Sequence, residues 1–225
     1  MNNNYKLYDL TMGLFVAVLI ISNIVSTKII AVGPFTFDGG TILFPIVYIF
    51  GDVITEVYGF KGSRRIIWVG FFSLLLMSAI TWIVGIMPAA SGWNLQESYN
   101  NIFMTAPRIA IASMIAYWMG EFTNSFILAK MKVWTQGRHL WTRTVGSTIF
   151  GELIDTAVFC TIAFAGVLTN SLLVTVMVSN YIFKVCYEII ATPLTYWVVN
   201  IYKKTEKIDV YDLNGFNPFK INMTQ

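Results

Sequence analysis

Residues 66–86 read IIWVGFFSLLLMSAITWIVGI, a run of 21 residues without a charged side chain. A helix needs about 20 apolar residues to cross the hydrocarbon layer of a bilayer. The run therefore predicts a transmembrane helix, which we extend to 65–90. Five other stretches satisfy the same condition, so the sequence predicts six transmembrane helices at approximately 10–32, 41–59, 65–90, 107–129, 143–168 and 172–201.

The composition of the whole chain also indicates a membrane protein. Of its 225 residues, 56% are hydrophobic and only 12% are charged, which is about half the charged share of a soluble domain. This deficit excludes a soluble enzyme, a disordered chain and a disulfide scaffold. Because the apolar runs lack the alternating pattern of a β-barrel, we expect an all-α integral membrane protein.

Basic residues are concentrated on one set of loops. Twelve of the 15 lysines and arginines fall on alternate loops and the tail, while the opposite loops are almost free of cations. By the positive-inside rule the basic side is cytoplasmic, so we expect both termini in the cytoplasm. The chain is expected to form one six-helix transmembrane domain over 1–203. The short cytoplasmic tail over 204–225 is too small to hold a core and is a candidate for disorder.

Six acidic residues interrupt the predicted transmembrane helices, and one lysine accompanies them. A charge at the centre of a bilayer costs roughly 2.5–3.5 kcal/mol on insertion scales, so these side chains must face one another, a cation or water. Charged residues inside a membrane are candidates for function by default. The set consists of Asp52, Glu56, Glu121, Glu152, Asp155, Lys184 and Glu188.

Spacing predicts which of these charges share a helix face. The acids of 41–59 are four residues apart, those of 143–168 are three apart, and the lysine of 172–201 precedes the acid by four. The members of each pair therefore lie on one face. With a rise of 1.5 Å per residue, Asp155 lies about 18 Å from the cytoplasmic end of its helix, and Lys184 lies about 18 Å from the outer end of its helix. Charges from four helices are thus expected to meet between the midplane and the cytoplasmic leaflet, in a polar cavity suited to a transporter.

Two structural interpretations of these charges stay open at the level of sequence. Lys184 and Glu188 could form a purely structural pair within one helix. Glu56 could instead sit near the inner headgroups, beside Lys61. Either arrangement would remove the residues concerned from a substrate site.

Enzymatic functions have no support in the sequence. His139, the only histidine, lies in a predicted cytoplasmic loop, so neither a Ser–His site nor an HExxH zinc site is available inside the membrane. The chain also lacks a P-loop and the Gly-x-Gly-Asp segment of an intramembrane aspartyl protease. We expect a transporter of a polar solute, with no catalytic residue, no metal site and no cofactor.

Several segments, in order along nearly the whole chain, carry a family resemblance. They are FPIVYIFGDVITEVYG at 44–59 followed by Arg64-Arg65, RIAIASMIAY at 108–117, STIFGELID at 147–155, and Phe183-Lys184, Glu188 and Pro193 on the last helix. These segments resemble the VUT family of queuosine precursor transporters, of the YhhQ type. One departure is Glu121, which stands where glutamine is common in the family.

The resemblance implies a six-helix inner-membrane fold similar to the substrate-binding components of energy-coupling vitamin transporters. It also implies import of 7-deazaguanine bases, preQ0 and preQ1 or queuine, for tRNA modification. The chemistry of the residues agrees, because a guanine-like edge offers N–H and exocyclic amine groups that a carboxylate can accept. We expect a multi-pass protein of the cell (inner or plasma) membrane.

The predicted binding site combines the intramembrane charges with nearby aromatic residues, which suit stacking on a flat ring. Asp155 and Glu152 are expected to bind the purine edge, and Asp52 and Arg108 to order or gate the cavity. The predicted substrate-binding residues are Asp155, Glu152, Glu188, Lys184, Asn180, Asp52, Arg108, Phe159, Phe44 and Tyr117.

The expected partners are a small-molecule 7-deazaguanine substrate and the lipid bilayer, with no nucleic acid. An alternative function is the substrate-binding subunit of an energy-coupled transporter for another vitamin-like heterocycle. Such a subunit would need a docking face for an energising partner, for which Ala112, Ala116 and Gly120 are candidates. These small residues at four-residue steps equally suit close contact between helices. A homodimer is a further expected arrangement.

Overall fold

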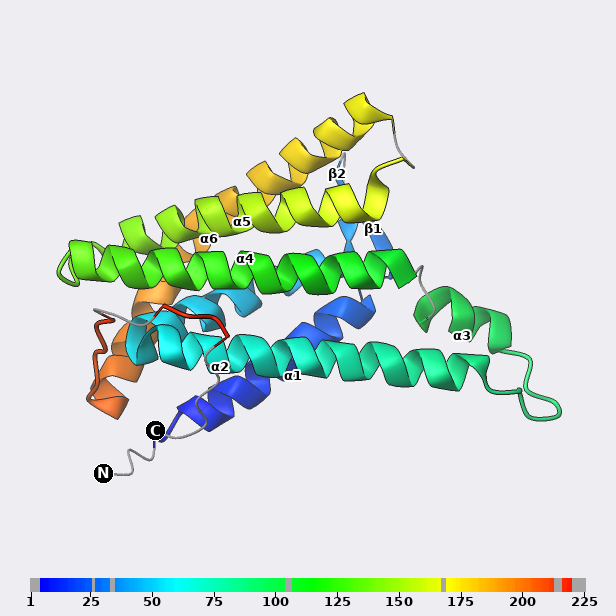
Figure 1. Ribbon diagram of the computed structural model, residues 1–225, viewed down its shortest axis with the longest axis horizontal. Coiled ribbons are helices and arrows are strands. Elements are labelled where there is room, and N and C mark those ends of the chain that lie inside the picture. The colour runs from blue at the N-terminus through cyan, green and yellow to red at the C-terminus, as the bar shows by residue number, and fades with distance from the viewer. Residues whose placement is uncertain are drawn as a thin grey trace.

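The computed structural model is a bundle of long helices with a two-stranded antiparallel sheet (Figure 1). It describes residues 5–25, 27–32, 35–103, 107–166, 169–212 and 216–219. In chain order the elements are α1 (Tyr8–Val25), β1 (Ile29–Val32), β2 (Phe35–Asp38), a short 3-10 helix (Gly39–Ile42), α2 (Phe44–Ile86), α3 (Gln96–Phe103), α4 (Pro107–Trp134), α5 (Leu140–Phe164) and α6 (Asn170–Glu206).

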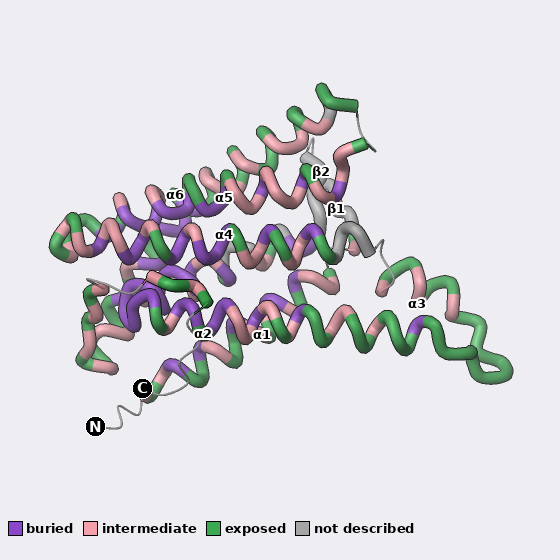
Figure 2. Tube along the Cα trace, viewed as in Figure 1, coloured by how far each residue is buried: buried purple, intermediate pink, exposed green. Residues whose placement is uncertain are grey.

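The distribution of apolar side chains fits an integral membrane protein. Among the described helices, α1, α2, α5 and α6 are long and apolar enough to cross a membrane. Ile190 and Trp197 of α6 are exposed, whereas Asp52 and Glu56 of α2 are buried, and exposed residues follow α6 and the later part of α2 (Figure 2). A soluble protein shows the opposite pattern. The number of six crossings and the cytoplasmic position of the termini stay predictions.

Helix α2 consists of two helical halves that fold back on each other. At Gly59 the backbone leaves the helical conformation, with φ 74° and ψ −178°, a region that glycine adopts without steric cost. Thr55 and Ser63, on either side of this position, share a hydrogen bond of 2.5 Å, and Figure 1 shows the chain reversing there. The predicted helices 41–59 and 65–90 correspond to these two halves.

The first predicted helix, 10–32, is too long. Helix α1 ends at Val25, and Ile29–Val32 pair with Phe35–Asp38 as antiparallel strands. The segment that was expected to continue the helix is rich in isoleucine and valine, whose branched side chains suit a pleated strand. The all-α prediction therefore holds for the bundle but not for this hairpin.

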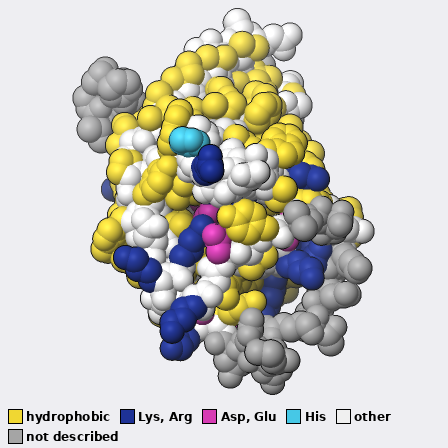
Figure 3. All heavy atoms as spheres, turned by 90° about the vertical axis from the view of Figure 1, so that its left-hand side faces the viewer, with side chains coloured by type: hydrophobic (Ala, Val, Ile, Leu, Met, Phe, Trp, Pro, Cys, Tyr) yellow, Lys and Arg dark blue, Asp and Glu magenta, His cyan; other side chains and the backbone are white. Residues whose placement is uncertain are grey.

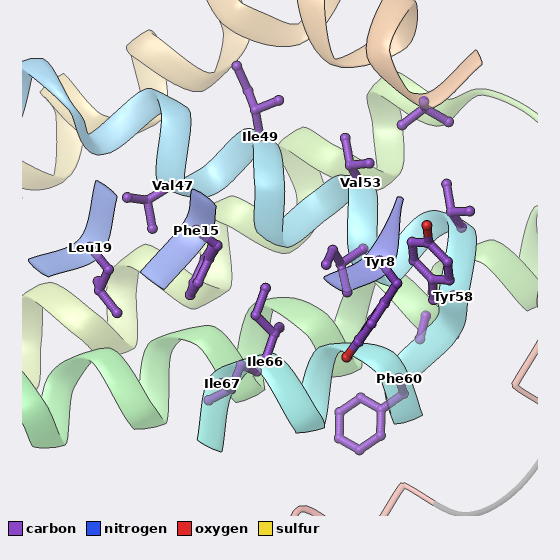
Figure 4. Close-up of a cluster of buried hydrophobic side chains, with 14 of the residues drawn as sticks. Tyr8, Phe15, Leu19, Val47, Ile49, Val53, Tyr58, Phe60, Ile66 and Ile67 are labelled. Atoms are coloured by element: carbon purple, nitrogen blue, oxygen red, sulfur yellow. The ribbon is translucent and has the colours of Figure 1, made fainter. Parts of the chain in front are cut away.

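The apolar core lies between α1 and the two halves of α2. Phe15 and Leu19 of α1 belong to one buried cluster with Val53 from the first half and with Ile66 and Ile67 from the second half (Figure 4). All five side chains are buried. This packing holds α1 against α2 and leaves another face of α2 free to contact α4 and α6.

The described part of the C-terminal tail packs on the bundle, so its residues up to 212 and 216–219 are not the disordered segment for which 204–225 was a candidate. Asp212 Oδ2 accepts a hydrogen bond of 2.7 Å from the backbone N–H of Phe60. Pro218 O accepts one of 2.9 Å from Trp68 Nε1. The tail needs no core of its own because it satisfies polar groups of α2.

Gly59→Ala is expected to lower stability and to release the tail. A Cβ atom at Gly59 would lie 2.6 Å from Asp212 Oδ2 and 2.8 Å from the Val210 side chain, in addition to the cost of about 1–3 kcal/mol for a non-glycine residue with this positive φ and extended ψ. Gly92→Ala is the matched control, because Gly92 also has a positive φ but open space around it. The measurements are the melting temperature in detergent and protease cleavage of the tail. Equal effects of the two substitutions would show that tail contact is unimportant.

Candidate functional site

Six of the predicted intramembrane charges come together inside the bundle, from four helices. We call them the central cluster: Asp52 of α2, Glu121 of α4, Glu152 and Asp155 of α5, and Lys184 and Glu188 of α6. Asp52 interacts electrostatically with Glu188 and Glu121, and Glu121 interacts with Asp155. The spacing along each helix brings these groups to the same interior surface.

Lys184 joins α6 to α5 through two carboxylates. Its Nζ lies 2.6 Å from Asp155 Oδ2 and 2.9 Å from Glu152 Oε2. Within the part of the chain that the structure describes, Lys184 forms no ion pair with Glu188, so the proposed structural pair within one helix is not found. Lys184 pairs instead with Glu152 and Asp155, which are three residues apart on the face of α5 next to α6. The cluster thus contains five carboxyl groups and one ammonium group.

Asp52 is held by an asparagine that the sequence-based site did not include. Asn124 Nδ2 donates a hydrogen bond of 2.9 Å to Asp52 Oδ1. Asp52 Oδ2 and Asn124 Oδ1 are also buried, and neither has a hydrogen-bond partner among the described residues. Asn124 follows Glu121 by three residues, so its helical spacing was a usable signal for this position.

Two glycines allow α4 and α5 to approach closely at the cluster. A Cβ atom at Gly120 would lie 2.8 Å from Asp155 Cβ, and one at Gly151 would lie 2.8 Å from Asn124 Cβ. Larger side chains would therefore separate the two helices exactly where they present acidic and amide groups to the interior. The close contact sets the relative position of Asp155 and Asn124.

The small-residue face of α4 contacts α5 and is not a surface for another protein. Ala112 and Ala116 are buried, and Gly120 lies against α5. The prediction of close helix contact is confirmed. The alternative, that Ala112, Ala116 and Gly120 dock an energising partner, is wrong because the same face is already covered within the chain.

Gly151→Ala is expected to destabilise the bundle by about 1–3 kcal/mol, the usual cost of overpacking. The added methyl group would push Asn124 and weaken its bond to Asp52, so uptake should fall as well. Gly146→Ala is the control on the same helix, because its Cβ would meet only the flexible Met131 side chain. Melting temperature in detergent and transport are compared for both variants. Wild-type values for Gly151→Ala would contradict the assigned packing.

A second ion cluster surrounds Glu56, one helical turn from Asp52. Glu56 Oε1 lies 2.7 Å from Arg143 Nη2 and 2.7 Å from Lys203 Nζ, and 3.7 Å from Lys132 Nζ. The side chain of Glu56 is fully buried. The Glu56 carboxylate of α2 thereby forms ion pairs with one cation each from α4, α5 and α6.

The tail contributes the second acid of this cluster. Asp209 accepts hydrogen bonds from Lys132 and Lys203. Although burial by itself raises the pKa of Asp209, these hydrogen bonds outweigh it and lower the pKa below its usual value. We call Glu56, Lys132, Arg143, Lys203 and Asp209 the basal cluster. Lysines and arginines surround acidic side chains on this end of the molecule (Figure 3).

The basal cluster shows the partners of Glu56. The residue is buried and forms ion pairs with three cations, while Lys61 is exposed, and its position relative to the inner headgroups stays a prediction. Sequence reasoning missed this cluster because its members come from the ends of four elements and from the tail. No spacing rule within one helix reports contacts of that kind.

Of the remaining predicted site residues, the three whose side chains are described are not members of the central cluster. Tyr117 packs against the apolar core, and Phe159 contacts another aromatic ring of α5. Asn180 is exposed on α6. Phe44 and Arg108 belong to α2 and α4, and their side chains lie outside the described part of the structure.

An apolar helical bundle that holds charged side chains from four helices in its interior has the architecture of a multi-pass membrane transporter. Comparison with known proteins agrees with this class. The chain belongs to the family described as "Putative vitamin uptake transporter", whose model matches residues 38–198. It is therefore a transporter and not an enzyme.

Three relatives of the chain are named as queuosine precursor transporters or probable ones. The chain is 27% identical over 189 residues to a "Probable queuosine precursor transporter" of Bacillus subtilis, covering 82% of both chains. It is 30% identical over 143 residues to a protein of the same name from Haemophilus influenzae, covering 61% of this chain and 57% of the relative. It is 29% identical over 125 residues to the "Queuosine precursor transporter" of Escherichia coli, covering 56% and 54%. No solved structure matches the chain.

Proposed function

We propose that this protein imports 7-deazaguanine precursors of queuosine, preQ0 and preQ1 or queuine, across the cell membrane for tRNA modification. The observation that carries the proposal is the central cluster, in which carboxyl groups from four helices meet inside an apolar bundle. The curated relatives, which are named as queuosine precursor transporters, support the same substrate class.

The cluster has the chemistry that such a base requires. A guanine-like edge presents N–H donors, and carboxylates accept two of them at once. The five carboxyl groups exceed the single ammonium of Lys184, so an additional cation is favourable. The aminomethyl group of preQ1 supplies one. We therefore propose that preQ1 is bound more tightly than preQ0.

Asp155 is the carboxylate that we propose to meet this cation. Its side chain is 15% exposed, whereas that of Glu152 is fully buried. The amino group of the substrate can replace part of the interaction that Lys184 makes with Asp155. Binding would then loosen the link between α5 and α6, and this gives the substrate a means of changing the conformation of the bundle.

The proposal is tested in cells that cannot make preQ0 but keep the later steps of queuosine synthesis. The chain is expressed, each base is supplied at low concentration, and queuosine in tRNA is scored by boronate-gel shift. We expect a shift with at least one base that cells with an empty vector lack. Absence of a shift with every base, despite expression in the membrane, would overturn the substrate assignment.

The same assay tests the role of Asp155. Asp155→Ala should abolish the shift, because the substrate loses its carboxylate partner. Asp9→Ala is the matched control, since Asp9 is an exposed acid at the start of α1. Wild-type uptake by Asp155→Ala would remove Asp155 from the site but would leave the transport function standing.

A further inference from the structure

Several acceptors in and beside the central cluster are buried without a hydrogen-bond partner among the described residues, and they include Glu152, which forms an ion pair with Lys184. Asp52 Oδ2, Asn124 Oδ1 and Glu188 Oε1 are buried and have no hydrogen-bond partner within the described ranges. Asp52, Asn124 and Glu188 are each at most 3% exposed. An unpaired buried polar group costs about 1–3 kcal/mol. Because this cost arises on α2, α4 and α6 together, it points to a ligand that donates hydrogen bonds to these three oxygens.

The two acids of α5 form ion pairs with a cation of the chain itself. Lys184 Nζ donates a hydrogen bond to Asp155 Oδ2 and lies 2.9 Å from Glu152 Oε2. In contrast, Asp52 and Glu188 form no ion pair among the residues that the structure covers, although they interact electrostatically with each other. The acids of α5 thus have an internal cation, whereas Asp52 and Glu188 have none among the described residues.

We infer that Asp52 and Asn124, with Glu188 facing them, hold the donor-bearing edge of the heterocycle. This inference rests on the proposed transport of 7-deazaguanine bases and assigns the edge to a different pair from Asp155 and Glu152. Asn124 serves two purposes: its amide fixes the Asp52 carboxylate, and its carbonyl oxygen becomes a second acceptor. The site then prefers rings that carry a 2-amino group beside an N–H.

The bond between Asp52 and Asn124 makes the pair specific. Since Asn124 Nδ2 donates a hydrogen bond of 2.9 Å to Asp52 Oδ1, Asp52 Oδ2 and Asn124 Oδ1 remain as acceptors on two side chains that are held together, one from α2 and one from α4. A carboxylate and an amide oxygen accept two adjacent N–H donors of one ring edge. A ring without the exocyclic amine would leave one of these oxygens buried and unpaired.

The experiment compares 7-deazaguanine with 7-deazahypoxanthine, which lacks only the 2-amino group. Binding of each base is measured on the purified full chain in lipid nanodiscs. The wild-type protein should bind 7-deazaguanine about 10- to 100-fold more tightly, the usual effect of leaving a buried acceptor unpaired. Asp52→Asn and Asn124→Ala should each reduce this ratio to near unity. Asp52→Asn keeps the side-chain volume, so it remains informative if Asn124→Ala misfolds.

Asn23→Ala is the control, because Asn23 lies on α1 and its amide bonds only to the backbone of its own helix in the structure. The outcomes separate the two proposals. If the wild-type protein binds neither base nor any of preQ0, preQ1 and queuine, the proposed function fails. If it binds both bases equally, or if Asp52→Asn and Asn124→Ala keep the wild-type ratio, the assignment of the edge fails while the transport function stands.

Discussion

Glu56→Ala is expected to destabilise the helix bundle by about 3–5 kcal/mol, the cost of removing one partner of a buried ion pair. The substitution leaves the buried Arg143 without its carboxylate partner, and the buried Lys132 keeps only Asp209 as a carboxylate partner among the described residues. Lys203 loses the Glu56 carboxylate at 2.7 Å. Because these cations come from three different helices, repulsion between them would separate α4, α5 and α6 at one end of the bundle.

The measurement is the apparent melting temperature in detergent, with Glu97→Ala as the control. Glu97 is an exposed acid on α3, so its loss should change the melting temperature little. Glu56→Gln separates charge from volume, since it keeps the shape but cannot neutralise three cations. Equal melting temperatures for Glu56→Gln and the wild type would show that packing around Glu56, and not its charge, holds the helices together.

The gathering of intramembrane acids could be predicted from the sequence, because the argument needs only helix geometry and the cost of burying charge. Glu152 and Asp155 are three residues apart and lie on a helix that is long enough to cross a membrane. An isolated charge in lipid is unfavourable, so each helix had to turn its acids inward. The same reasoning identified α4 as a helix that packs closely through small residues.

The partner of each charge could not be predicted in this way. Lys184 is four residues from Glu188 but pairs with Asp155 of α5, because the choice depends on how α6 is rotated against α5. Similarly, Asp209 completes the basal cluster only because the chain folds back after α6. Side-chain partners across elements depend on tertiary packing, which a single sequence does not report.

The hairpin of β1 and β2 illustrates a second limit. Hydropathy describes how readily a segment leaves water, but it does not distinguish a helix from a short strand. The apolar segment Ile29–Val32 satisfied the length criterion for continuing the first helix, yet it pairs with Phe35–Asp38. Short apolar runs remain ambiguous when their branched side chains suit either structure.

Lys184→Met is expected to reduce uptake on the order of 100-fold and to destabilise the bundle by about 3–5 kcal/mol. The lysine is the only cation bonded to Asp155 and Glu152 in the described part of the chain. Its removal would leave two neighbouring carboxylates that repel each other and no link of this kind between α5 and α6. Transport is scored through queuosine in tRNA, and stability through the melting temperature in detergent. Lys204→Met, at an exposed position near the end of α6, is the control.

A double variant distinguishes the structural role of Lys184 from its role in transport. Asp155→Asn removes one negative charge, so combining it with Lys184→Met restores the net charge of the group formed by Lys184, Asp155 and Glu152. Coupled neighbours usually recover about 0.5–3 kcal/mol in such a pair, so stability should rise again. Uptake should stay low, because the Asp155 carboxylate that meets the substrate cation is missing. Recovery of both properties would mean that the ion pair only joins α5 to α6, and the proposed contact between Asp155 and the substrate would then be wrong.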